Sequence, residues 1–205
     1  MVDLGSASGA VGLMIAARVR LGRLTLVERD PDLVALAREN IALNGCEAFA
    51  GAVRADAFTS ELDTLAGEAD LVVTNPPFFD DAGPSSPDPR RRAAHVMQGG
   101  TLSDWLVAAA RMLGPRGRLC LIHRADEAAA CLSSLLFGSA AIVPIYPRIE
   151  ADASRIVVSA VRGGRSPLRI LPALVLHGPD GRFTAEAALL HGSGARAKEK
   201  GAAAP

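Results

Sequence analysis

The sequence predicts an α/β fold, with helices covering both faces of a mostly parallel β-sheet. The main observation is that short apolar, strand-like segments alternate with longer segments of helical spacing. The length of 205 residues suits one domain. Hydrophobic residues make up 49% of the chain and aromatic residues only 4%, so Ala, Val, Leu and Ile are expected to fill the core.

Composition excludes several classes of protein. No run approaches eighteen consecutive apolar residues, so we expect no membrane span, and residues 1–12 lack the basic start and apolar run of a signal peptide. The cysteines at 46, 120 and 131 form no CxxC pair and are interpreted as small buried residues of a reducing, cytoplasmic compartment. The net charge is zero, so any basic surface must be local.

The expected elements of the first half follow in order. Met1–Leu4 is interpreted as the end of a strand, followed by a helix near Val11–Val19 and a strand at Leu24–Glu28. Asp30-Pro31 begins the next helix, because Asp is a good N-cap and Pro suits the first helical position. Gly45 is expected to end that helix. Its apolar face is predicted to contain Leu33, Leu36, Ala37 and Ile41.

Two further strands are expected at Ala52–Ala55 and Asp70–Thr74. The Pro-, Asp- and Arg-rich stretch Asn75–Gln98 is longer than ordinary connections, so we interpret it as either a functional loop or a disordered one. Thr101 to Asp104 resembles a capping box. The helix that begins there is expected to end at Gly114. Its apolar residues recur at helical spacing: Leu102, Trp105, Leu106, Ala109, Met112 and Leu113.

The last third is expected to close one edge of the sheet. Arg118–His123 is predicted to be a strand and Asp126–Leu136 a helix. Ala140–Tyr146 and Arg155–Arg162 are predicted to be two strands joined by a short loop. Leu168–His191 contains a strand-like segment and a turn at Gly178-Pro179-Asp180-Gly181. The Ala-, Gly- and Lys-rich tail Ser193–Pro205 is expected to be disordered.

A loop of small residues, Asp3-Leu4-Gly5-Ser6-Ala7-Ser8-Gly9, separates the first strand from the first helix. Small residues let a ligand approach the backbone, and a helix N-terminus offers unpaired N–H groups. Alternatively, the glycines can be required only by the backbone conformation of a tight strand–helix turn, without any ligand. Glu28 ends the second strand about 20 residues later, where a carboxylate can bind ribose hydroxyls. The Asp56 carboxylate, after the third strand, could accept a hydrogen bond from an adenine amine. A nicotinamide dinucleotide would be bound by the same arrangement, so it remains an alternative ligand.

The segment Asn75-Pro76-Pro77-Phe78, after the fourth strand, favours one chemistry. Two prolines fix the backbone as it leaves the strand, so the Asn75 amide oxygen and the Pro76 carbonyl can converge on one NH2 donor. Phe78 offers a flat stacking face. An amine conjugated to a ring is a poor nucleophile, and binding both of its N–H bonds favours attack on an electrophilic methyl group. A Pro-rich turn with a capping Asn is the alternative interpretation.

Taken together, these motifs resemble the class I S-adenosylmethionine-dependent methyltransferases of the N6-adenine type. The narrower similarity is to bacterial tRNA adenine N6-methyltransferases that modify adenine 37 of a valine tRNA. It rests on Ala35–Gly45, Asn75–Phe79, Trp105, Gly117–Asp126, Pro147–Arg148, Ala153–Arg155 and Leu171–Gly181. The resemblance implies a Rossmann-like, mostly parallel seven-stranded sheet with an antiparallel last strand. It also implies a tRNA substrate and no metal.

The resemblance assigns roles to particular residues. The cofactor S-adenosyl-L-methionine would be bound by Asp3, Gly5, Ser6, Gly9, Glu28, Asp56 and Asn75. The catalytic segment that holds the acceptor amine would be Asn75, Pro76, Pro77 and Phe78. Ala7 departs from the family, which has glycine there. The family also has a segment before the first strand, so we expect a domain at residues 1–192 that lacks this segment.

Alternatives remain open at this stage. Similar NPPF motifs serve glutamine-amide and guanine-N2 methyltransferases, so a protein glutamine methyltransferase is one rival and a non-catalytic binding module is another. Arg90-Arg91-Arg92 could contact RNA phosphates, although a solvated charge run beside Asp80, Asp81 and Asp88 fits equally well. His95, His123, His177 and His191 form no metal-binding spacing. Arg148 and Arg155 are candidates for the substrate side or for surface ion pairs.

Overall fold

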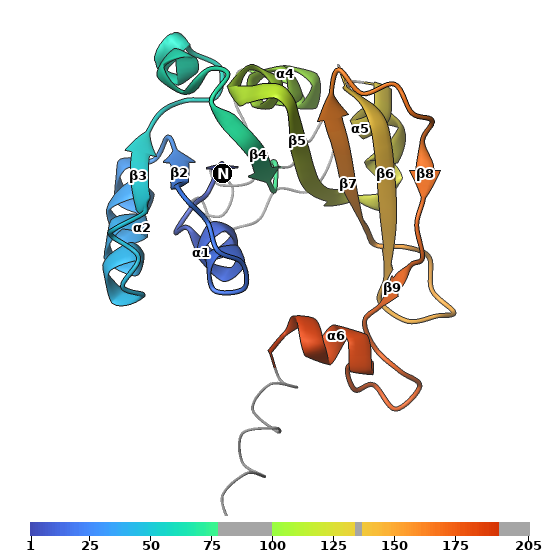
Figure 1. Ribbon diagram of the computed structural model, residues 1–205. Coiled ribbons are helices and arrows are strands. Elements are labelled where there is room, and N and C mark those ends of the chain that lie inside the picture. The colour runs from blue at the N-terminus through green and yellow to red at the C-terminus, as the bar shows by residue number, and fades with distance from the viewer. Residues whose placement is uncertain (78–99, 134–136, 193–205) are drawn as a thin grey trace, which may run out of the picture.

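One β-sheet organises the computed structural model, which describes residues 1–77, 100–133 and 137–192 (Figure 1). The strand order is β3-β2-β1-β4-β5-β7-β6-β8, with β9 also paired to β6. The strands are β1 (Val2–Leu4), β2 (Leu24–Glu28), β3 (Ala50–Arg54), β4 (Ala69–Thr74), β5 (Leu113–Arg124), β6 (Phe137–Tyr146), β7 (Arg155–Arg162), β8 (Arg169–Ile170) and β9 (Leu174–Val175).

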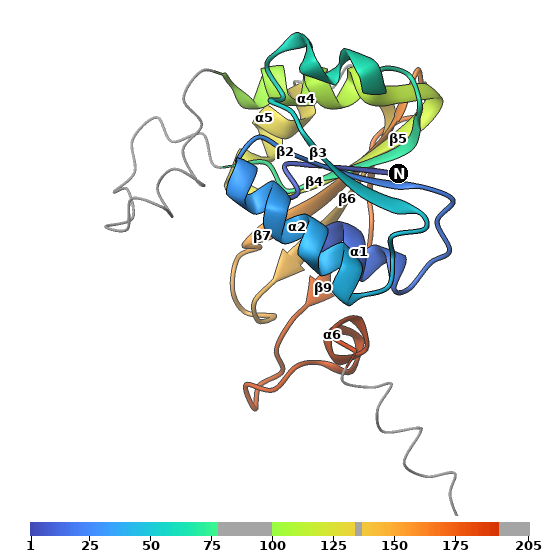
Figure 2. The same cartoon turned by 90° about the vertical axis from the view of Figure 1, so that its left-hand side faces the viewer.

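The helices alternate with the strands along the first half of the chain. They are α1 (Ala10–Ala16), α2 (Pro31–Leu43), the 3₁₀ helix η1 (Ser60–Leu65), α4 (Leu102–Met112), the 3₁₀ turn η2 (Ala125–Glu127), α5 (Ala128–Ser133) and α6 (Ala185–Leu190). Figure 2 shows α1 and α2 on one face of the sheet and η1, α4 and α5 on the other, as predicted. Within the described residues, no helix is long and apolar enough to cross a membrane.

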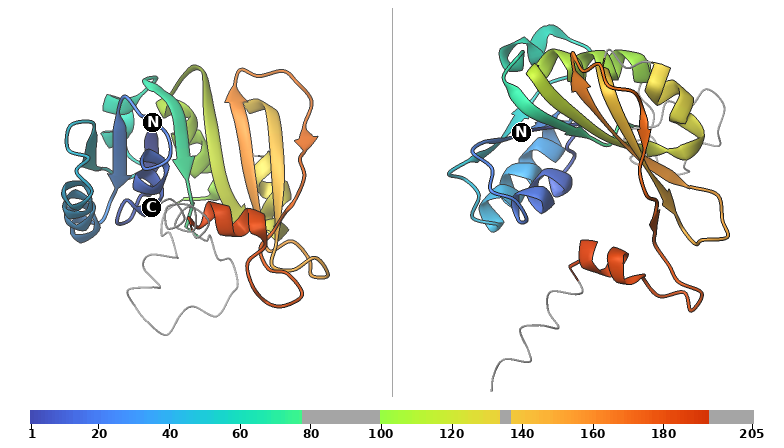
Figure 3. Two further views of the ribbon diagram at one scale, coloured as in Figure 1. Left: turned by 60° about the horizontal axis from the view of Figure 1, so that its bottom comes forward. Right: turned by 45° about the vertical axis from the view of Figure 1, so that its right-hand side comes forward.

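The predicted strand directions are confirmed. Strands β1 to β5 pair in parallel, whereas β7 runs antiparallel to both β5 and β6. The short strands β8 and β9 extend the edge opposite β3 (Figure 3), so that the sheet has nine strands, two more than the seven expected. The sequence suggested one continuous strand there. Pro172, which has no N–H to donate, lies between the two short strands.

Two apolar clusters pack on the two faces of the sheet. The larger cluster joins η1, α4 and α5 to the central strands and includes Leu62, Leu106 and Cys131. The smaller cluster packs α2 against β2 and includes Leu26, Ala37 and Ile41. Aliphatic and alanine side chains supply most of this core, as the composition predicts.

Helix α2 begins as predicted but presents a different apolar residue. The Asp30 carboxylate accepts hydrogen bonds from the N–H groups of Asp32 and Leu33, at 2.8 and 3.3 Å, and so caps the helix. Leu36 was expected on the buried face but is 42% exposed, whereas Val34 is 3% exposed. Val34, with Ala37 and Ile41, follows the i, i+3, i+7 spacing of one helix face, and Leu36 points about 100° away from Ala37.

The other boundaries differ in detail. The capping box at the start of α4 is present, with Thr101 and Asp104 bonding each other's backbone N–H groups. The helix predicted from Asp126 is a 3₁₀ turn followed by α5, and residues 134–136 lie outside the described part. Sequence reasoning missed α6, whose N-cap is Thr184. The tail from residue 193 also lies outside the described residues.

Candidate active site

The four predicted site segments leave the sheet at the same edge. Leu4, the last residue of β1, pairs with Val27 in β2 and with Thr74 in β4. Glu28 in turn pairs with Arg54 at the end of β3. Four features therefore lie at the carboxyl edge, where open α/β sheets bind their ligands. They are the loop after β1, the Glu28 side chain, the loop that contains Asp56, and the Asn75 segment.

The loop after β1 is folded so tightly that it uses left-handed backbone conformations. The φ angles of Gly5, Ala7 and Gly9 are +70°, +46° and +82°. A Cβ atom on Gly9 would lie 2.5 Å from Cδ1 of Leu26, so this position accepts only glycine without rearrangement. Ala7 adopts the same backbone region despite its methyl group, at a cost of about 1–2 kcal/mol.

Two buried polar residues, Asp3 and Ser6, lie in and beside this loop. Asp3 is 2% exposed, and its Oδ2 accepts a hydrogen bond of 2.8 Å from the Gly12 N–H. Burial raises the pKa of Asp3 to about 6, although the Gly12 bond acts in the opposite direction. The Ser6 hydroxyl is buried and has no hydrogen-bond partner in the described residues. An orphaned hydroxyl beside closely approachable glycines fits a polar ligand.

Glu28 does more in the structure than the sequence suggested. Its Oε2 accepts a hydrogen bond of 2.9 Å from the Ala7 N–H, and its Oε1 accepts from the Arg29 and Asp30 N–H groups, at 2.8 and 3.0 Å. The carboxylate therefore fastens the small-residue loop to the end of β2. From the other side, the Asn40 amide donates to the Ser8 carbonyl at 2.9 Å. Ribose binding by Glu28 stays a prediction.

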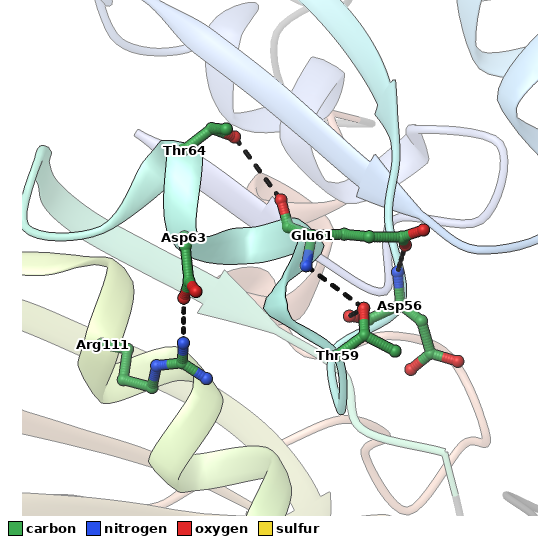
Figure 4. Close-up of polar contacts among 6 residues, drawn as sticks. All are labelled: Asp56, Thr59, Glu61, Asp63, Thr64 and Arg111. Carbon is green, nitrogen blue, oxygen red and sulfur yellow. Dashed lines mark hydrogen bonds and ion pairs between the residues drawn. The ribbon is translucent and has the colours of Figure 1, made fainter.

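Asp56 lies in a hydrogen-bonded turn after β3. Its Oδ1 accepts from the Phe58 N–H at 2.9 Å, and its own N–H donates to the Glu61 carboxylate at 2.9 Å. Figure 4 shows the Asp56 carboxylate pointing away from the Glu61 side chain. An ion pair between Asp63 and Arg111 ties the following 3₁₀ helix η1 to α4. The backbone around Asp56 is thus held while its carboxylate stays at the carboxyl edge.

The Asn75-Pro76-Pro77 segment continues directly from β4. Asn75 is exposed, Pro76 is buried and Pro77 is half-buried, so the asparagine side chain is accessible while the following proline anchors the chain. Phe78, the last member of the predicted catalytic segment, lies outside the described residues. The same holds for Phe79, His95 and the Arg90–Arg92 run.

Sequence reasoning missed the link that lies under these loops. Trp105 was interpreted as an ordinary core residue, and it is indeed buried. Its indole Nε1 donates to the Thr74 hydroxyl at 3.0 Å, and that hydroxyl donates to the Leu4 carbonyl at 2.7 Å. Only the three-dimensional pairing of β1, β4 and α4 brings these residues together.

The remaining candidates lie along the neighbouring strands. His123 is buried on β5, and burial lowers its pKa. Arg124 of β5 pairs with Arg155 of β7, and Arg148 is exposed in the loop after β6. Among the described residues, no three His, Cys, Asp or Glu side chains are grouped as metal ligands.

A family model described as "methyltransferase small domain" matches residues 1–144 of the chain. A tRNA1(Val) (adenine(37)-N6)-methyltransferase from Aeromonas hydrophila is 30% identical over 90% of this chain and 77% of that one. A protein of the same name from Porphyromonas gingivalis W83 is 33% identical over 62% of this chain, which spans about half of that relative's length (50%).

Solved structures agree on the fold. A crystal structure from Agrobacterium tumefaciens, described as a predicted O-methyltransferase, has a TM-score of 0.75 and 27% identity, covering 93% of this chain and 87% of that one. TrmN from Thermus thermophilus has a TM-score of 0.52 and 21% identity, covering 78% of this chain and 42% of that one. The second likeness supports the fold alone.

Proposed function

The chain belongs to the methyltransferase small domain family, and we propose that it transfers a methyl group from S-adenosylmethionine to the N6 amine of an adenine in tRNA. The observation that carries this proposal is the pairing of Leu4 with Thr74. It places the small-residue loop and the Asn75-Pro76 segment at the first positions beyond two adjacent strands. This arrangement would hold a cofactor loop and an amine-binding segment side by side.

The residues of the loop side fit S-adenosylmethionine, which when bound supplies an electrophilic methyl group on a sulfonium. We assign the buried Ser6 hydroxyl and the loop backbone to its amino-acid end, together with the Asp3 carboxylate. The Glu28 carboxylate at the end of β2 would bind the ribose hydroxyls. The Asp56 carboxylate, one strand further along, would accept from the adenine amine of the cofactor.

On the acceptor side, the chain's own groups favour a planar nitrogen. The Asn75 side-chain oxygen and the Pro76 carbonyl are acceptors only, so they suit an NH2 group with two N–H bonds. Hydrogen bonds to both N–H groups would localise the lone pair on the nitrogen, which then attacks the methyl carbon. The nitrogen–methyl bond would form as the methyl–sulfur bond breaks, S-adenosylhomocysteine would leave, and the methylated amine would release one proton to solvent. Catalysis on this account comes mainly from positioning two reactants, which can lower a barrier by several kcal/mol.

The choice of RNA as the substrate is supported by the names of the relatives. The Aeromonas hydrophila and Porphyromonas gingivalis proteins are both named as tRNA1(Val) adenine-37 N6-methyltransferases. The described name of the Agrobacterium tumefaciens structure points instead to oxygen as the acceptor. The two acceptor oxygens, one on the Asn75 side chain and one on the Pro76 carbonyl, favour an amine over a hydroxyl, because an amine brings two donors.

A partition experiment tests the class of substrate. The protein is incubated with radiolabelled S-adenosylmethionine, tRNA from cells lacking the adenine-37 modification, and a total protein extract. We expect the label in the RNA fraction, and ribonuclease treatment should abolish it. Label that appears in protein instead would favour glutamine-amide methylation and contradict the proposal. Binding of the cofactor without any transfer would indicate a non-catalytic module.

A further inference from the structure

Trp105 connects three loops of the site. A Cβ atom on Gly5 would lie 2.8 Å from Cζ2 and 2.9 Å from Cη2 of Trp105, so the indole ring lies directly against the loop after β1. The ring also makes an edge-to-face contact with Phe58, with centroids 6.0 Å apart, in the turn that also contains Asp56. Its Nε1 reaches Thr74 at the end of β4.

The Thr74 hydroxyl has a defined orientation in this arrangement. An indole N–H can only donate and a carbonyl oxygen can only accept. The Thr74 hydroxyl must therefore accept from Trp105 while it donates to the Leu4 carbonyl. Thr74 is 3% exposed and Trp105 is 4% exposed, so water does not compete for either bond. Such charge-neutral bonds in a dry environment are directional and fix their partners.

The hydrogen bond from Thr74 to Leu4 joins the two halves of the site. Leu4 precedes Gly5, where the loop after β1 begins, and Thr74 precedes Asn75. Leu4 and Thr74 are also the last paired residues of the β1–β4 ladder. Beyond this pair the two loops have no ladder to hold their spacing, so the side-chain link acts where the backbone pairing ends.

We infer that Thr74 is a positioning residue, which, together with Trp105, sets the spacing between the loop after β1 and the Asn75-Pro76 segment. This inference rests on the proposed function. A methyl group and an attacking nitrogen react only within a narrow range of separations, and a misplacement of about 1 Å can cost on the order of 100-fold in rate. A residue that merely filled the core would influence stability instead.

The kinetic test compares Thr74→Val, which keeps the shape but removes the hydroxyl, with Thr74→Ser, which keeps the hydroxyl. Thr25→Val is the matched control, because Thr25 is a buried threonine in strand β2 of the same sheet. We expect Thr74→Val to lower kcat at saturating substrates by about 10- to 100-fold. Its Kd for S-adenosylmethionine should stay within about threefold, because Glu28 and Asn40 still hold the loop. Thr74→Ser and Thr25→Val should keep near-normal kcat.

Equal kcat values for Thr74→Val and Thr25→Val would overturn the inference. So would a Thr74→Ser variant as impaired as Thr74→Val, since the missing methyl group would then be responsible. If Thr74→Val does not fold, the kcat of Trp105→Phe tests the inference instead. It keeps a ring against Gly5 but loses the donor, and the inference fails if its kcat equals that of the wild type.

A second arm needs no RNA and separates this inference from the proposed function. Trp105 is the single tryptophan of the chain, so all tryptophan fluorescence comes from the residue bonded to Thr74. We expect Thr74→Val to shift the emission maximum and to reduce by at least half the fluorescence change that follows the addition of S-adenosylmethionine. Thr25→Val should do neither. Emission and response identical to the wild type would overturn the link, whether or not any RNA is methylated.

Discussion

The Glu28 carboxylate accepts a hydrogen bond of 2.9 Å from the backbone N–H of Ala7, a residue held in the left-handed region at φ +46°. Ala7 carries a Cβ atom, and the loop nonetheless retains the conformation that glycine would adopt freely. The end of β2 thus stabilises a loop whose own sequence disfavours its shape. Glu28 serves the site in two ways, by fastening the loop and by presenting a carboxylate at the carboxyl edge.

Replacing Glu28 by Ala should weaken the binding of S-adenosylmethionine by about 1.5–3 kcal/mol, the value of hydrogen bonds to a charged group. Titration calorimetry measures this change directly. Glu39→Ala is the control, since Glu39 is an exposed glutamate on α2. An affinity unchanged by Glu28→Ala would remove Glu28 from the cofactor site.

Asn75→Ala should separate binding from chemistry. The exposed Asn75 amide is proposed to accept from the reacting amine, so its loss should lower kcat severely, by about 100-fold or more, while cofactor affinity stays near normal. Single-turnover kinetics with preloaded cofactor tests this, and Asn44→Ala, on the C-cap of α2, is the control. Wild-type turnover in Asn75→Ala would show that the segment does not hold the amine.

The buried Asp3 should make stability depend on pH. Its pKa in the folded protein is about 6, above the ordinary value of 3.8, so the folded state binds a proton more tightly than the unfolded state. This contribution is fully present below about pH 4 and is lost as the pH rises through 6. The loss amounts to about 3 kcal/mol at neutral pH.

Asp3→Asn keeps an acceptor for the Gly12 N–H and removes the titration. The free energy of unfolding of the wild type, relative to Asp3→Asn, should therefore fall between pH 4 and pH 7 by roughly the amount above. Urea denaturation at both pH values provides the measurement. Asp32→Asn, at an exposed position in α2, makes the same charge change as a control. A difference that is constant with pH would refute the buried-carboxylate account.

The basic run Arg90–Arg92 gives a prediction that comes from sequence alone. If it contacts phosphates, the triple alanine variant should bind unmodified tRNA more weakly and with a shallower dependence of log Kd on log salt concentration. Fluorescence anisotropy at several salt concentrations measures that slope. An identical slope in the variant would place the run on the solvated surface.

Much of the fold could be predicted because local signals agreed with it. The Asp30-Pro31 cap, the Thr101 capping box and the apolar strands each specify their own position in the chain. The failures have physical causes. Leu36 is apolar yet exposed, since composition does not reveal which side of a helix meets the sheet. The helix α6 has only six residues, too few for a periodic pattern.

The site was predicted only as far as single segments allowed. Gly5, Glu28, Asp56 and Asn75 could be placed at the carboxyl edge because each ends or follows a strand that the sequence predicts. The bond between Thr74 and Trp105 spans 31 positions along the chain and depends on how α4 packs. No spacing in the sequence predicts it. Nor does any spacing predict the hydrogen bond that the Ala7 N–H donates to the Glu28 carboxylate.

Identification of the methylated atom tests the central claim most directly. Wild-type protein is incubated with unmodified valine tRNA and S-adenosylmethionine, and the tRNA is digested to nucleosides for mass spectrometry against authentic standards. The account predicts N6-methyladenosine, formed at one equivalent per tRNA and formed far more slowly with Asn75→Ala. A 2′-O-methylated nucleoside, N2-methylguanosine, or no methylated nucleoside would contradict it.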